Sequence, residues 1–155
     1  MTSKADFNAE EWSTVVEGPL LAGLRVVAAD RGGTIRESVA IGRVYNEARQ
    51  AHGQSELLDA LASSPPGVDP QKLQGQGDLA TVAVQRLRDA VRLVAEKGGP
   101  EDVKAYGEFV RGVAQAAAEA HKEGGFIGIG GKQVSEAEQG AIDEISEIVA
   151  GPPTA

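Results

Sequence analysis

The chain contains no cysteine, which excludes disulfide bonds, thiolate metal sites and cysteine nucleophiles together. Aromatic residues make up only 4% of its 155 residues, so we expect a core of aliphatic side chains on closely spaced elements. No apolar run approaches the roughly 20 residues of a membrane-spanning helix, and the N-terminus lacks the apolar segment of a signal peptide. These absences predict a cytoplasmic protein that does not insert into a membrane.

Basic residues are also in short supply. Lys and Arg together number 15 against 23 Asp and Glu, which gives a formal net charge of -8. Nucleic-acid binding depends on basic side chains that neutralise phosphates, so the acidic balance predicts no nucleic-acid partner. The length suits one domain with a sizeable core. We predict a single helical domain over residues 1–155, with a connection rich in Pro, Gly and Ser near residues 63–77 between two halves.

Helical periodicity dominates the rest of the chain. Apolar side chains recur at intervals of three or four residues, and no segment alternates apolar and polar residues for long enough to require a strand. Pro19 lies inside the first periodic segment and lacks a backbone donor, so we expect a kink or a break near Gly18. The sequence therefore predicts an all-α fold, a compact bundle of five to six helices.

Two parts of the chain resemble each other. Residues 20–50 and 105–149 each contain a helix, a glycine turn and a second helix that begins with a Thr or Ser cap. A duplication would make the bundle pseudo-twofold. Glycine at helix ends and Ser or Thr at helix starts are common enough to explain the similarity without a duplication, so both interpretations remain open.

The most distinctive segment spans residues 122–135. Five glycines let its backbone turn sharply, yet it also carries three large apolar side chains, which loops seldom do. These side chains either fill the end of the bundle or form a patch that a partner covers. The predicted structural or partner-binding loop consists of Gly124, Gly125, Phe126, Ile127, Gly128 and Ile129.

One helix start resembles a known family. Asp30, Gly32 or Gly33, Ile35 and Glu37 resemble the Asp-Gly-x-Ile-x-x-x-Glu pattern of TerB-like domains, the helical family linked to tellurite resistance and stress, although the spacing differs. The resemblance implies a TerB-like helical arrangement and a divalent-metal site that includes Asp30 and Glu37. Arg31 departs from the pattern, and the second glycine junction has no Asp at the matching position. The glycine-rich segment also resembles segments of uncharacterised bacterial all-helical proteins.

Other chemistries find little support in the spacing. The chain has no Walker A loop, no Gly-x-Ser-x-Gly elbow and no pair of Glu-x-x-His motifs. His121 suits the end of a helix, where positive charge is favourable, better than a ligand cluster. The last helix is acidic, which indicates either a solvated face or an acidic interaction surface. Its acidic residues are Glu136, Glu138, Asp143, Glu144 and Glu147.

From these observations we predict a non-catalytic helical binding or assembly protein that self-associates or recruits a protein partner. A homodimer is the commonest symmetric solution, and the small residues along 107–118 would let a partner helix approach closely. One alternative is a TerB-like stress-response module that binds a divalent cation. Another is a small enzyme with a pocket at the 124–131 loop, near His121. We expect no other cofactor.

Overall fold

The computed structural model describes residues 2–29, 35–53, 55–64, 78–124 and 136–150. All regular secondary structure in these ranges is helical, so the predicted all-α class is confirmed, and the number of α-helices matches the predicted five to six. The elements are η1 (Lys4–Asp6), α1 (Ala9–Ala29), α2 (Ile35–Gln50), α3 (Glu56–Ser63), α5 (Leu79–Lys97), α6 (Pro100–Gly124) and α7 (Glu136–Val149).

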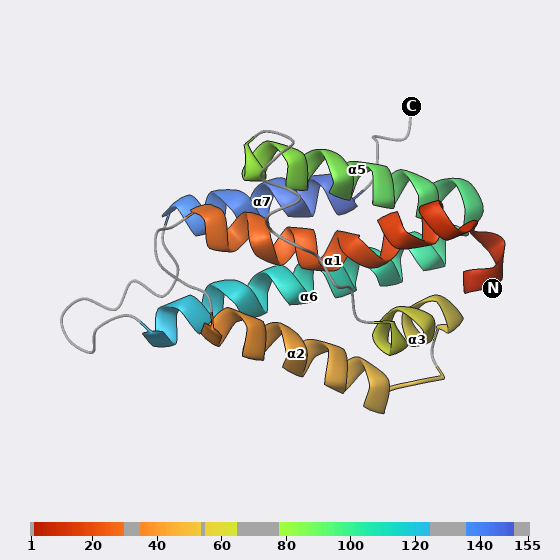
Figure 1. The fold of residues 1–155 in the computed structure, drawn as a ribbon, viewed down its shortest axis with the longest axis horizontal. Helices are drawn as coiled ribbons and strands as arrows, with labels where there is room; N and C mark the ends of the chain where they lie inside the picture. Colours follow the sequence, from red (N-terminus) through yellow and green to blue (C-terminus); the bar gives the residue numbers. More distant parts are fainter. Residues whose placement is uncertain (1, 30–34, 54, 65–77, 125–135, 151–155) are drawn as a thin grey trace.

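The helices form three layers (Figure 1). Helices α1 and α6 make the middle layer, α5 and α7 lie on one side of it, and α2 and α3 lie on the other. Helix α6 contacts each of the other five α-helices, and α1 packs mainly against α5 and α6. Helices from before and after residues 63–77 therefore share contacts. None of the described helices is long and apolar enough to cross a membrane.

The core is mainly aliphatic, in keeping with the scarcity of aromatic residues. Valine, leucine, isoleucine and alanine from all the α-helices meet in one large cluster. Among the completely buried members are Val15, Leu61, Val94, Val110 and Ile145. Burying a side chain of this size contributes about 1.5–3 kcal/mol, so this cluster supplies most of the driving force for the fold.

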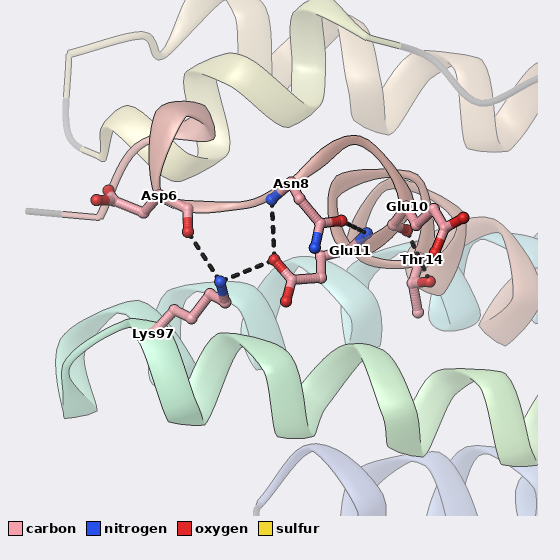
Figure 2. Close-up of polar contacts among 6 residues, drawn as sticks. All are labelled: Asp6, Asn8, Glu10, Glu11, Thr14 and Lys97. Atoms are coloured by element: carbon pink, nitrogen blue, oxygen red, sulfur yellow. Dashed lines mark hydrogen bonds and ion pairs between the residues drawn. The ribbon is translucent and has the colours of Figure 1, made fainter.

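The start of α1 is capped as its sequence predicts. The Asn8 backbone nitrogen donates to Glu11 Oε2 over 2.8 Å, and the Glu11 backbone nitrogen donates to Asn8 Oδ1 over 2.9 Å. Figure 2 shows Lys97, from the end of α5, beside this cap. Its Nζ lies 2.7 Å from Glu11 Oε2 and 3.1 Å from the Asp6 carbonyl oxygen. Lys97 thereby joins the N-terminal segment to the turn between α5 and α6.

Of the kink or break predicted near Gly18, the break is wrong, because α1 runs through Pro19 without interruption. Proline has no amide hydrogen, so the Val15 carbonyl lacks its usual partner four residues later. The Tyr106 hydroxyl of α6 donates to this carbonyl oxygen over 2.7 Å. Gly18 makes room for it, since a Cβ there would lie only 2.0 Å from the hydroxyl oxygen. A side chain from another helix thus replaces the hydrogen bond that Pro19 removes.

Tyr45 of α2 is a second buried tyrosine with a different environment. Its ring packs edge-on against Phe109, with the ring centroids 5.1 Å apart. Its hydroxyl has no hydrogen-bond partner among the described residues. Burial raises the pKa of both the Tyr45 and the Tyr106 phenol far above their ordinary value of 10.0, so both stay protonated.

Several of the small residues on α6 pack against other helices of the same chain, whereas Gly112 and Ala116 are half-buried. A Cβ on Gly107 would lie 3.1 Å from the Val149 carbonyl oxygen of α7. Ala114, Ala117 and Ala118 are completely buried. The buried small residues serve close packing between helices of one chain, and the homodimer contact at this face stays a prediction.

Helix α7 has acidic residues on its solvent face and one on its buried side. Glu136, Asp143 and Glu147 are exposed and Glu144 is half-buried, as a solvated face requires. Glu138, by contrast, is only 2% exposed. The serine predicted to cap the start of this helix, Ser135, lies outside the described residues.

Candidate functional site

A hollow lies between α5 and α7, and we call it the α5–α7 groove. It encloses about 650 Å³. Val91 is buried at its base, Ile148 is half-buried beside it, and Ala95 is exposed. Charged side chains form its walls. The full lining consists of Arg88, Val91, Arg92, Ala95, Glu96, Glu144, Glu147 and Ile148.

The two helices that make the walls carry opposite charge. Helix α5 contains four basic and two acidic residues, whereas α7 contains five acidic residues and no basic one. Two arginines on α5 and two glutamates on α7 line the groove. The groove therefore has a mainly basic wall and an acidic wall over an apolar base.

Two of the four opposed charged side chains are held by partners within the chain. Glu144 accepts from Arg25 of α1, with its Oε2 3.0 Å from an Arg25 terminal nitrogen and 3.2 Å from Nε. Arg92 forms an ion pair with Asp89, one turn earlier on α5. Arg88 and Glu147 are exposed and have no ion pair with another described residue. Ion pairs within the chain thus neutralise only part of the charge that lines the groove.

A second hollow lies between α1 and α5 and encloses about 490 Å³. Arg92 and Glu96 line both hollows, so the exposed ridge of α5 separates them. Here the charges are better matched within the chain, because Arg86 lies 2.9 Å from Glu17 of α1 and Asp89 holds Arg92. This hollow offers less unsatisfied charge than the α5–α7 groove.

The chemistry of the α5–α7 groove suits binding. Its lining provides guanidinium and carboxylate groups, which hold oppositely charged side chains, and an apolar base that gains from being covered. Its lining residues include no histidine, serine, tyrosine or lysine.

The residues predicted from the glycine-rich segment lie mostly outside the described residues. Gly124 is the last residue of α6, and the other five predicted loop residues, from Gly125 to Ile129, fall in the range that the structure leaves undescribed. His121 lies in the last turn of α6, but its side chain is outside the described part. The choice between a plug and a partner-binding loop therefore stays a prediction.

The side chains of the two predicted metal ligands also lie outside the described part of the structure. Asp30 lies outside the described residues, and Glu37 lies near the start of α2 with a side chain that is not described. Within the described ranges, no group of three or more His, Asp or Glu side chains is placed to hold a metal ion. The TerB-like metal site remains a prediction from the resemblance.

Sequence reasoning did not pair α5 with α7. It identified the acidic last helix as a candidate interaction surface but could not tell that α5, which comes well before it in the chain, lies beside it. The available signal was the charge contrast between the two segments. What was missing was the three-layer arrangement, which brings the two helices together on one side of α1 and α6.

No family model matches this chain, and no curated protein or solved structure is similar enough to count as a match. Its function is therefore inferred from the residues and their geometry.

Proposed function

We propose that this chain is a non-catalytic assembly protein that self-associates through the α5–α7 groove, with a second copy of the same chain as the occupant. The observation that carries the proposal is the apolar base between a basic α5 wall and an acidic α7 wall. A surface that carries both charges side by side can pair with the same surface of a second copy.

The symmetry of a dimer makes this explicit. A twofold axis parallel to the groove places α5 of one copy over α7 of the other, and the reverse contact follows from the symmetry. Arg88 and Arg92 of each copy then face Glu144 and Glu147 of its partner. Opposite charges meet twice, and the two apolar bases cover each other. A twofold axis across the groove would instead bring arginines against arginines, which is unfavourable.

We expect the dimer to be reversible. The apolar base comprises Val91, Ala95 and Ile148, whereas the interfaces of obligate dimers are larger and more apolar. The charged walls would set the orientation of the two copies and the rate at which they meet. Association should therefore depend on protein concentration and weaken as salt is added.

A charge-swap experiment tests the proposal. One variant carries Arg88→Glu and Arg92→Glu, and the other carries Glu144→Lys and Glu147→Lys. Each variant alone should be monomeric, because like charges would face each other in both contacts of the dimer. Mixed in equal amounts, they should form a heterodimer in which both contacts again join opposite charges. Sedimentation velocity of each protein alone and of the mixture measures this directly.

The controls keep the result interpretable. Circular dichroism and urea unfolding of each variant establish that the fold is intact before association is compared. The native protein should shift from monomer to dimer as its concentration rises. A native protein that stays monomeric up to high concentration would contradict self-association, and so would variants that fail to restore association when mixed.

A further inference from the structure

The ion pairs around the α5–α7 groove occupy charges that a second copy would otherwise meet. Arg25 holds Glu144 on the acidic wall, and Asp89 holds Arg92 on the basic wall. The Arg25 side chain is 21% exposed and is not among the groove-lining residues, so it reaches Glu144 from the α1 side. Among the opposed side chains, Arg92 and Glu144 thus have internal partners, whereas Arg88 and Glu147 have no ion pair with another described residue; α5 also contributes Glu96 to its wall.

We infer that Arg25 and Asp89 are internal competitors that limit self-association, an inference that rests on the proposed function. Arg25 lowers the negative potential of the acidic wall, and Asp89 lowers the positive potential of the basic wall. To form a new ion pair across a dimer, Glu144 and Arg92 must share or leave the partner that they already have. The two internal ion pairs therefore keep the dimer weak and make its strength sensitive to changes at residues outside the contact itself.

The net charge of the protein allows a sharp test. Arg25→Gln makes an already acidic chain more negative, so general repulsion between two copies should increase. The competitor model predicts the opposite result, because Glu144 becomes available to the partner's arginine. We expect Arg25→Gln to tighten the dimer by roughly tenfold, the effect of two exposed ion pairs, one in each of the two symmetric contacts. Asp89→Asn should tighten it by a similar factor.

A matched control separates the two effects. Arg86→Gln produces the same change in net charge and also breaks an ion pair between α1 and α5, but Arg86 does not line the α5–α7 groove. It should leave the dimer unchanged or slightly weaker. Dimer dissociation constants of the native protein and the three variants can be measured by sedimentation equilibrium at one low salt concentration. Arg25→Met provides a second variant without the charge if the glutamine variant is poorly folded.

The outcomes distinguish this inference from the proposed function. If the native protein does not dimerise, the proposed function fails, and the inference fails with it. If the native protein dimerises but Arg25→Gln and Arg25→Met associate no more tightly than Arg86→Gln, the proposed function survives and the competitor inference is overturned. Tighter association of Arg25→Gln despite its greater negative charge supports the inference.

Discussion

The contact between α1 and α6 at Tyr106 and the groove between α5 and α7 represent two opposite ways in which neighbouring helices meet in this bundle. At the first, a proline removes a hydrogen bond, a tyrosine hydroxyl replaces it over 2.7 Å, and a glycine makes room for that hydroxyl. At the second, charged side chains stand exposed on both sides of an apolar base.

The difference separates a contact that stabilises one chain from the surface through which we propose that two copies bind. A buried carbonyl without a partner is costly, so the Tyr106 contact must be complete within one chain. Exposed charges contribute little to the stability of a single chain, because water already solvates them. Some charged side chains of the α5–α7 groove can therefore stay without ion-pair partners in a single chain. Substitutions at the Tyr106 contact should change the free energy of unfolding, whereas substitutions at the groove should change association.

The largest effect is expected at Gly18. Gly18→Val places side-chain atoms where the Tyr106 hydroxyl lies, so it overpacks the contact and displaces the hydrogen bond to Val15. We expect a loss of about 3 kcal/mol or more in the free energy of unfolding, from the sum of overpacking and an unsatisfied carbonyl. Urea unfolding followed by circular dichroism measures this change.

Gly42 provides the matched control. It lies in α2 with open space around a built Cβ, so Gly42→Ala should be neutral or stabilise the fold by about 0.5–1 kcal/mol. If Gly18→Val costs no more than an ordinary surface substitution, the account of the Tyr106 contact is wrong.

The two buried tyrosines should respond differently to the same change. Tyr106→Phe leaves the Val15 carbonyl without its partner, and we expect a loss of about 1–3 kcal/mol. Tyr45→Phe removes a buried hydroxyl that has no partner among the described residues while it keeps the ring against Phe109. It should be neutral or stabilising. Equal losses in urea unfolding of the two variants would show that the hydrogen bond to Val15 carries no special weight.

The N-terminal end of α1 should show an intermediate, pH-dependent effect. The Lys97 ammonium and the Asn8 amide hold the pKa of Glu11 below its ordinary value of 4.5. A carboxyl group whose pKa is lowered by folding stabilises the fold above its unfolded pKa, and this contribution disappears as the pH falls through the folded pKa. We therefore expect the native protein to lose more stability than Glu11→Gln does when the pH falls below about 4.5.

Urea unfolding at a series of pH values checks this prediction. Glu47→Gln, which makes the same change at an exposed position of α2, serves as the control and should follow the native protein. If Glu11→Gln shows the same acid dependence as the native protein, the ion pair with Lys97 does not contribute to stability.

The smallest effect on stability is expected at the α5–α7 groove. The Arg92 side chain is 61% exposed, so Arg92→Gln should change the free energy of unfolding by no more than about 0.5 kcal/mol. Its effect should be on association, which it weakens by removing charge from the basic wall. A large loss of stability without a change in association would reverse the proposed division between the two regions.

Much of the fold was predictable because helix signals are local. Helix starts carry signals of their own, such as the capping box at Asn8 and Glu11, the Ser55 cap of α3 and Pro100 in the first position of α6. The uninterrupted course of α1 was not predictable, because it depends on Tyr106, which lies far along the chain from Pro19. Local rules register the missing donor of proline but not the distant hydroxyl that replaces its hydrogen bond.

The candidate site was less predictable for the same reason. Acidic charge on the last helix is visible in the sequence, but the basic wall belongs to a different helix, and only packing brings Arg92 and Glu147 to one groove. The small residues of α6 suggested an outer contact because the sequence cannot tell a helix face that meets another part of its own chain from one that meets a partner.

Cross-linking between single-cysteine proteins tests most directly the claim that α5 of one copy lies over α7 of another. The chain has no cysteine of its own, so Ala95→Cys and Glu147→Cys each introduce a single thiol at an exposed groove position. The two proteins are distinguished by a size tag and mixed in equal amounts. The mixture is oxidised briefly at a protein concentration near the dissociation constant of the native dimer. The account predicts that the mixed disulfide, which joins the Ala95→Cys protein to the Glu147→Cys protein, forms faster than either self-linked product. Self-linked products that form at least as fast as the mixed one would contradict it.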